Sequence, residues 1–203
     1  MKREGYDEDW LSTTLPFTYA YLMQFKSVLV KRAAYQKYYH REIREHGKVV
    51  RLQPIAPFYS MYNINRESFA RYRVAWKRMA ARMEATVLTL YKTPFGTKPV
   101  VATDTTSLFT AKTADEAHYL CAILNSRTVD EFIRSFSSGG RGFGAPSVVK
   151  NLAIPLFIEG ARIHRRLAGL SRRAHEEVRR GRDTAQIEEE INEAVEELWN
   201  LKR

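Results

Sequence analysis

The sequence lacks the features that mark several large classes of protein. Its one cysteine, Cys121, allows no internal disulfide, and no apolar run approaches the roughly 20 residues needed to span a bilayer. The charged start, MKREGYDEDW, is not followed by an apolar stretch, so we expect no signal peptide and a cytoplasmic location. We therefore expect no membrane partner, with binding of the basic residues to an anionic lipid surface as a weaker alternative.

Motifs for common catalytic and metal sites are also missing. No Gly-x-Gly-x-x-Gly follows a strand-like run, no Gly-x4-Gly-Lys-Ser/Thr occurs, and no Cys/His cluster has zinc spacing. Cys121 lies within an apolar helical pattern, and His118 is its only neighbouring histidine in sequence. We predict no catalytic residue, no metal site and no cofactor in this chain. A binding function is favoured over a self-contained enzyme, while an enzyme with an unrecognised site is a third possibility.

Positive charge is present in excess and is concentrated in the first half of the chain. The formal net charge is +10. Residues 24–51 hold eight Lys/Arg against two acids, and residues 66–98 hold the same numbers, whereas residues 99–158 and 159–203 are each balanced. A local excess of this kind is typical of a site for DNA or RNA. A basic protein without such a site is the alternative.

Aromatic and basic residues are interleaved in one stretch, FYSMYNINRESFARYRVAWKR, at residues 58–78. Its only acid is Glu67. Lysine and arginine can hold phosphates, and flat rings can contact bases or sugars, so this stretch suits a nucleic-acid surface. However, Tyr72, Val74 and Trp76 also alternate with polar residues as a half-buried strand does, which makes a structural role the alternative for the rings.

The first part of the sequence predicts a long helix. Thr14 can cap it and Pro16 fits its first turn, and the apolar spacing continues to about Tyr39 or beyond. Gly47 is expected to stop it. We therefore assign residues 1–53 to a long basic N-terminal helix.

The rest of the sequence predicts an α/β (α+β) fold with a small mixed or antiparallel sheet flanked by helices. Strand-like runs lie at residues 58–62, 72–77, 86–92, 100–103 and 107–111. A capping box at Thr113 and Glu116 begins a helix, and a short helix follows at residues 128–136. We divide this part into an α/β core at residues 54–158 and an Arg/Glu-rich helical segment at residues 159–203.

Several blocks resemble, in the same order along the chain, the C-terminal target-recognition region of adenine-specific DNA methyltransferases of restriction–modification systems (the TaqI/Eco57I-like group). The blocks are PFTYAYL at 16–22 with the residues up to Arg32, PFYSMYN at 57–63, SFA and YRVAWKR at 68–78, LCAILNS at 120–126, LAIP at 152–155, and AVEELWNL at 194–201 with Ile191. Together they span nearly the whole chain.

The resemblance implies the DNA-reading half of such an enzyme without its methyl-transferring half. The Asn/Asp-Pro-Pro-Tyr/Phe motif and the glycine-containing motif for S-adenosylmethionine, which the family carries on its catalytic domain, are absent from this sequence. A catalytic domain or subunit elsewhere would hold S-adenosylmethionine and flip the target adenine. The alternative is a protein-interaction or scaffold module that uses the C-terminal helices through Ile187, Ile191, Val195 and Leu198.

We expect double-stranded DNA to be the partner that the core contacts. Cations of the core would hold backbone phosphates, and loop residues would read base edges in the major groove. The expected phosphate contacts are Arg66, Arg71, Arg73, Lys77, Arg78, Lys92 and Lys98. The expected base-reading residues are Asn63, Asn65, Arg66 and Arg141.

Overall fold

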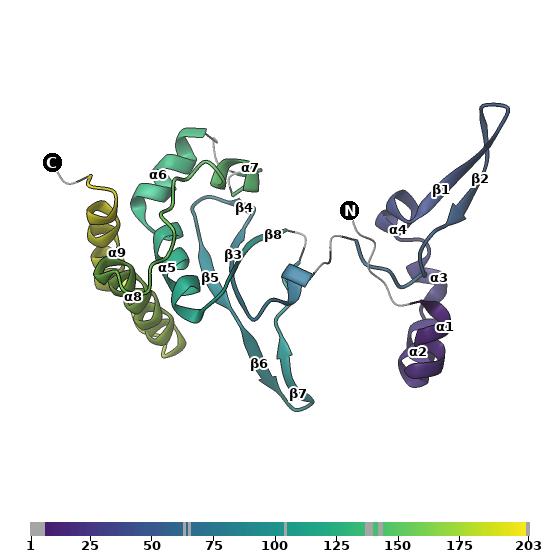
Figure 1. Ribbon diagram of the computed structural model, residues 1–203, viewed down its shortest axis with the longest axis horizontal. Helices are drawn as coiled ribbons and strands as arrows, with labels where there is room; N and C mark the ends of the chain where they lie inside the picture. Colours follow the sequence, from purple (N-terminus) through teal and green to yellow (C-terminus); the bar gives the residue numbers. More distant parts are fainter. Residues whose placement is uncertain are drawn as a thin grey trace. The chain divides into compact units, whose positions relative to one another are not determined.

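The computed structural model describes residues 7–62, 64, 66–103, 105–136, 140–141 and 144–201. The chain divides into two compact units, residues 1–66 (the N-terminal unit) and 67–203 (the C-terminal unit), which are drawn in Figure 1 and described separately. The predicted α/β fold class is confirmed, because helices accompany small antiparallel sheets. The three-part division after residues 53 and 158 stays a prediction.

The N-terminal unit consists of short helices followed by a hairpin. Its elements are α1 (Glu8–Thr14), α2 (Pro16–Met23), α3 (Lys26–Leu29), α4 (Ala33–Tyr38), β1 (His40–Glu45) and β2 (Lys48–Pro54). Asp7 begins α1 by accepting hydrogen bonds from the backbone N–H groups of Asp9 and Trp10 at 2.8 and 3.3 Å. Such a cap satisfies N–H groups that have no partner within the helix.

The single long helix predicted from residue 16 to Tyr39 and beyond is wrong. Arg32 has an extended backbone, with ψ 130°, and separates α3 from α4. Its guanidinium donates to the carbonyl oxygens of Leu29, Phe58 and Ser60 at 3.0, 2.8 and 2.9 Å. Leu22, Leu29 and Tyr35 of the short helices nevertheless pack into one core, whereas other apolar residues of the predicted stripe, such as Tyr21 and Val28, are exposed.

Tyrosine hydroxyl groups of this core donate hydrogen bonds to the segment after β2, at residues 55–62. Tyr35 Oη donates to the Ala56 carbonyl at 2.9 Å, and Tyr39 Oη donates to the Met61 carbonyl at 2.6 Å. Phe58 is buried against both tyrosines. The strand predicted at residues 58–62 is therefore wrong, since carbonyls of this segment bond to side chains of the helices instead of to a neighbouring strand.

Residues 40–54 form a β-hairpin and not the end of a helix. β1 and β2 pair antiparallel, and the turn residues His46 and Gly47 have φ values of 48° and 78°. Two-residue hairpin turns of the favoured type need positive φ at both positions, which glycine adopts without strain. Gly47 thus makes a turn where we predicted a helix stop. The hairpin extends away from the helices of its own unit (Figure 1).

The C-terminal unit is built on a three-stranded sheet. The strands of this unit are β3 (Tyr72–Lys77), β4 (Met79–Ala80), β5 (Ala85–Leu88), β6 (Leu90–Thr93), β7 (Gly96–Pro99), β8 (Thr106–Ala111) and β9 (Gly140–Arg141). The short 3₁₀ helix η1 (Arg66–Phe69) spans the boundary of the two units in the sequence. The sheet order is β5-β3-β8, with β3 antiparallel to both neighbours. β6 and β7 form a separate hairpin that extends beyond the sheet (Figure 1). The strand predicted at residues 100–103 is not formed.

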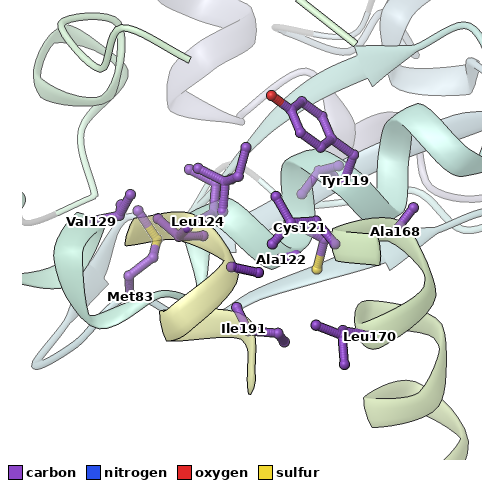
Figure 2. Close-up of a cluster of buried hydrophobic side chains, with 14 of the residues drawn as sticks. Met83, Tyr119, Cys121, Ala122, Leu124, Val129, Ala168, Leu170 and Ile191 are labelled. Atoms are coloured by element: carbon purple, nitrogen blue, oxygen red, sulfur yellow. The ribbon is translucent and has the colours of Figure 1, made fainter. Parts of the chain in front are cut away.

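Helices cover one face of this sheet. They are α5 (Ala114–Leu124), α6 (Arg127–Phe136), α7 (Pro146–Val149), α8 (Arg162–Arg179) and α9 (Ala185–Leu198). The predicted capping box is confirmed, because Thr113 Oγ1 accepts from the Glu116 N–H at 3.1 Å. Figure 2 shows side chains of α5, α6, α8 and α9 meeting Met83, from the segment between β4 and β5, in the core. The labelled helix residues are Tyr119, Cys121, Ala122, Leu124, Val129, Ala168, Leu170 and Ile191.

The Asn125-Ser126 pair that ends α5 also closes the edge of the sheet. Asn125 Oδ1 accepts from the Ala85 N–H at 2.8 Å, and its Nδ2 donates to the Ala85 carbonyl at 2.9 Å. Ser126 Oγ accepts from the Val129 N–H at 3.3 Å and so caps α6. The Leu-Asn-Ser block therefore has a structural role, since it joins β5 to the turn between two helices.

Candidate nucleic-acid interface

The end of β3 carries predicted cations on the surface. Lys77 is exposed and its Nζ lies 2.6 Å from Glu84 Oε2, while Arg82 Nε lies 3.1 Å from Glu84 Oε1. Hydrogen bonds from Lys77 and Arg82 lower the pKa of Glu84. Ion pairs between exposed side chains contribute only about 0.2–1 kcal/mol. A phosphate that approached Lys77 would therefore compete with a weak partner.

Long-range pairing brings the backbones of Arg78 and Arg141 together. Met79, which follows Arg78, pairs with Arg141 between β4 and β9, and the Gly144 N–H donates to the Arg78 carbonyl at 3.3 Å. Trp76 Nε1 donates to the Gly144 carbonyl at 2.8 Å and holds the same segment from the core side. A predicted phosphate contact and a predicted base reader thus lie at one end of the sheet, although the Arg141 side chain is outside the described part of the chain.

Lys92 and Lys98 lie on the β6–β7 hairpin but on opposite faces of it. Lys92 pairs with Thr97, and Lys98 pairs with Tyr91. Residues opposite each other in an antiparallel pair share a face, and successive residues alternate between faces. Both lysines can therefore contact phosphates of one duplex only if the hairpin stands edge-on in a groove, between the two strands. Both lysines are exposed, as is the Phe95 ring in the turn.

The remaining predicted residues lie near the junction of the two units. Arg66 is exposed at the start of η1, and the exposed Arg71 guanidinium lies 5.3 Å from the centre of the Tyr72 ring. Asn63 and Asn65 lie outside the described residues.

Arg73 is the predicted site residue that the structure places in the interior. Its side chain is 0% exposed, and its Nη1 donates to the Ser68 carbonyl. Its Nε and Nη2 have no hydrogen-bond partner within the described residues. Burial lowers the pKa of this guanidinium. The burial of Arg73 speaks against a phosphate contact, because strand β3 is buried on both faces from Arg73 to Trp76.

Because two nitrogens of the buried Arg73 guanidinium have no hydrogen-bond partner within the described residues, we expect its charge to contribute little to the stability of the fold. Arg73→Met should change the free energy of unfolding by less than about 1 kcal/mol or raise it, because an apolar side chain of similar length removes a buried charge without opening a cavity. Arg73→Ala should cost about 2–3 kcal/mol, since it leaves a void in the sheet face. Urea titrations followed by circular dichroism would measure both. A folded Arg73→Met variant that lost more than about tenfold in DNA affinity would contradict the buried role.

Most rings of the 58–78 stretch serve the two cores. Phe58 and Trp76 are 3% and 2% exposed, and Tyr59, Tyr62 and Tyr72 are partly buried. Tyr62 stacks on Tyr38 with ring centres 4.0 Å apart. Phe69, by contrast, is half exposed. The structural alternative therefore holds for most of these rings, and the cations carry the case for binding.

Sequence reasoning missed three exposed cations on the β1–β2 hairpin. We counted Arg41, Lys48 and Arg51 in the charge excess of residues 24–51 but named none of them as a site residue. We also placed them in the segment of the long helix, whereas all three extend from a two-stranded ribbon. The signal available in the sequence was Gly47, a common turn residue, followed by the β-branched and partly alternating run VVRLQ at residues 49–53.

Two partly buried histidines and the buried Cys121 take part in the packing of α5 on α8. His175 Nε2 accepts from the Val87 N–H at 3.2 Å, so Nδ1 is the nitrogen that donates to the Ser171 carbonyl at 2.7 Å. Burial, helped by the nearby His175, lowers the pKa of His118 to about 4, and burial raises the pKa of the Cys121 thiol to about 12. His118 and Cys121 are therefore uncharged near neutral pH.

A half-open cavity of about 700 Å³ lies next to this cluster, between β5 and the helices α5, α6, α8 and α9. Its polar lining is largely engaged internally. Arg127 pairs with Glu189 at 2.6 Å, Arg134 pairs with Asp130 at 2.6 Å, and Asn125 bonds to the Ala85 backbone. The cavity thus offers few polar groups that are not already bonded to the protein.

Searches for metal sites, membrane spans and relatives add no assignment. Across the described ranges, no three His, Cys, Asp or Glu side chains are grouped so as to hold a metal ion. Among the described helices, none combines the length and the apolar character needed to cross a membrane. Comparisons with family models, with curated proteins and with solved structures found no match.

Proposed function

We propose that the chain is a sequence-specific DNA-binding, target-recognition domain that works with an adenine N6-methyltransferase catalytic domain or subunit carried elsewhere. S-adenosylmethionine would bind to that catalytic part. The observation that carries the proposal is the placement of the charge. The cations concentrated in residues 24–51 and 66–98 are exposed, except for Arg32 and Arg73.

The proposed contacts fall into two kinds. Backbone phosphates would be held by Arg66, Arg71, Lys77, Arg78, Lys92 and Lys98, which are exposed side chains of the junction, the strand end and the β6–β7 hairpin. Base edges would be read by Asn63, Asn65, Arg66 and Arg141. Phosphate contacts position a protein on the duplex, and base contacts specify the sequence. The pairing of β4 with β9 supports this division, because it holds Arg141 beside the phosphate-holding end of β3.

Protein interaction is the second candidate function, and the structure changes its basis. The interaction module was first based on apolar residues of the last helix, α9. Of these residues, Ile187, Ile191 and Val195 are buried in the core of the C-terminal unit. An exposed apolar row instead lies on α2 and the segment after it, with Phe17, Tyr21 and Val28 each more than half exposed. Single exposed apolar residues are ordinary, so the case for contact with another protein rests on Phe17 and Tyr21, which lie one turn apart on α2.

Salt dependence of duplex binding tests the main proposal. With about 6 phosphate contacts, affinity should fall by roughly 10³ between about 50 and 200 mM salt, because each contact releases condensed counterions. Fluorescence anisotropy with a labelled duplex would measure it. Absence of binding at low salt would overturn the proposal. Self-association that ignores salt would favour protein interaction, and methyl transfer by the chain alone would contradict the missing catalytic half.

Two matched variants separate the proposed contacts within the same assay. Lys77→Ala should weaken binding to all duplexes about equally and reduce the slope of log K against log salt by about 1. Arg141→Ala should chiefly relax the preference among sequences, since Arg reads guanine edges. If the two variants behaved identically, the proposal that Lys77 holds a phosphate while Arg141 reads a base would be contradicted.

A further inference from the structure

We propose that one face of the β1–β2 hairpin is a second DNA contact, which enters a groove of the duplex. This inference rests on the proposed DNA-binding function and extends it to an element outside the expected contacts. The face is defined by the strand register. Arg41 pairs with Gln53, Ile43 with Arg51, and Glu45 with Lys48, so these six side chains share one side of the ribbon, called here the Arg41 face.

The register also explains how three cations reach one face. The pairing shifts between Ile43 and Arg44, which leaves Val50 as the extra residue of a bulge. Without that bulge, the strand alternation would place Lys48 on the opposite side from Arg51, because the two residues are an odd number apart. Bulges redirect side chains in this way. The Arg41 face therefore carries Arg41, Lys48 and Arg51 against the single acid Glu45.

The two faces of the ribbon differ in how their charges are used. On the opposite face, Arg44 and Glu42 form an ion pair at 2.6 Å and largely neutralise each other. On the Arg41 face, within the described residues, the three cations form no ion pair, and Arg41 makes only a long hydrogen bond of 3.4 Å to Gln53 Oε1. All three are exposed. Their charge is thus available to an outside anion.

The shape of the hairpin suits a groove. A major groove about 12 Å wide admits a two-stranded β-ribbon, and strands of this length extend roughly 20 Å at about 3.3 Å per residue. The base of the ribbon is held firmly. The Ile55 N–H donates to the Tyr39 carbonyl at 2.9 Å, and the His40 ring packs edge-on against Tyr35 at 5.0 Å. The face that would meet the duplex is therefore carried on a fixed base.

The side chains of the Arg41 face match the chemistry of DNA. Arginine pairs bidentately with guanine and glutamine with adenine, so the adjacent Arg41 and Gln53 could read base edges. Lys48 and Arg51, nearer the tip, would contact phosphates on either side of the groove. An anionic membrane or an acidic protein would use the charge but not the amide of Gln53, and both are outcomes of the test below.

The test compares charge removal on the two faces in the full chain. The triple variant Arg41→Ala, Lys48→Ala, Arg51→Ala should bind a labelled duplex at least about tenfold more weakly at 100 mM salt, with the salt slope reduced by about 2–3, because three phosphate or base contacts are lost. Arg44→Ala, on the same hairpin but the other face, is the matched control and should bind within about twofold of the parent. Arg51→Gln alone, a milder change, should reduce the slope by about 1.

The outcomes separate this inference from the proposed function. If the parent chain binds DNA in a salt-dependent way and the triple variant, with an unchanged circular dichroism spectrum, binds equally well, the hairpin contact is excluded while the function stands. If the parent does not bind DNA, both fail. The hairpin contact would also be overturned if the triple variant lost binding to vesicles containing phosphatidylserine, or to polyglutamate, while its affinity for DNA was unchanged. Should the triple variant not fold, Arg51→Gln decides by the same criteria.

Discussion

Replacing Trp76 with alanine should lower the free energy of unfolding of the C-terminal unit by about 3–5 kcal/mol. Trp76 is 2% exposed, packs against Phe109 with ring centres 4.7 Å apart, and bonds to the Gly144 carbonyl through Nε1 at 2.8 Å. Truncation therefore removes a large apolar contact, opens a cavity beneath α5 and leaves a carbonyl without its donor. Guanidinium titration followed by far-ultraviolet circular dichroism would measure the loss.

Trp76→Phe is the matched control because it keeps an aromatic ring in the core while removing the indole N–H and part of the ring volume. It should lose about 1–3 kcal/mol, the usual cost of leaving one buried polar group unpaired. If Trp76→Ala and Trp76→Phe were equally destabilising, a phenyl ring at this position would contribute nothing to the stability of the core. If Trp76→Ala cost less than about 1 kcal/mol, the central position of Trp76 in the core would be contradicted.

Replacing Gly144 with alanine should destabilise the C-terminal unit by about 2–3 kcal/mol, the cost of forcing an extra carbon into a packed site. A Cβ on Gly144 would lie 2.5 Å from the Lys77 carbonyl oxygen and 2.9 Å from Trp76 Cδ1. The backbone oxygen cannot move aside without shifting the end of β3. The expected result is therefore separation of the Gly144 segment from β3, which thermal unfolding and hydrogen exchange at Arg78 and Gly144 would detect.

Gly169→Ala provides the control for this substitution. Gly169 lies inside α8, and a Cβ there would meet no atom within 4 Å. Alanine in the middle of a helix is more stable than glycine by about 0.5–1 kcal/mol, so this variant should be slightly stabilised. An equal loss of stability at Gly169 and Gly144 would show that the close approach to Lys77 is not the cause.

The Gly144 variant also links stability to the proposed reading of DNA. The segment that Gly144 anchors carries β9, whose pairing with β4 holds the Arg141 backbone beside Arg78. Under conditions where Gly144→Ala is still folded, it should relax sequence preference in the same way as Arg141→Ala, because the base reader loses its position. Preserved sequence preference in a folded Gly144→Ala variant would separate Arg141 from this anchor.

Local patterns were sufficient for several elements. β3 lies at residues 72–77, where alternating apolar and polar residues predicted it, and α5 begins at the capping box of Thr113 and Glu116. These features depend on neighbours within four residues, so the sequence contains their full description. The same reasoning failed for residues 16–54, where an apolar spacing typical of a helix continued across Arg32 although the chain turns there.

For the candidate interface, the sequence by itself determined the position of the charge along the chain and the strand at residues 72–77 within it. Only the tertiary structure decided which cations can meet a partner. It buried Arg73, set Arg78 beside the backbone of Arg141, and aligned Arg41, Lys48 and Arg51 on one side of a hairpin. The physical reason is that side-chain direction in a sheet depends on strand register and bulges, which are set by contacts between residues far apart in sequence.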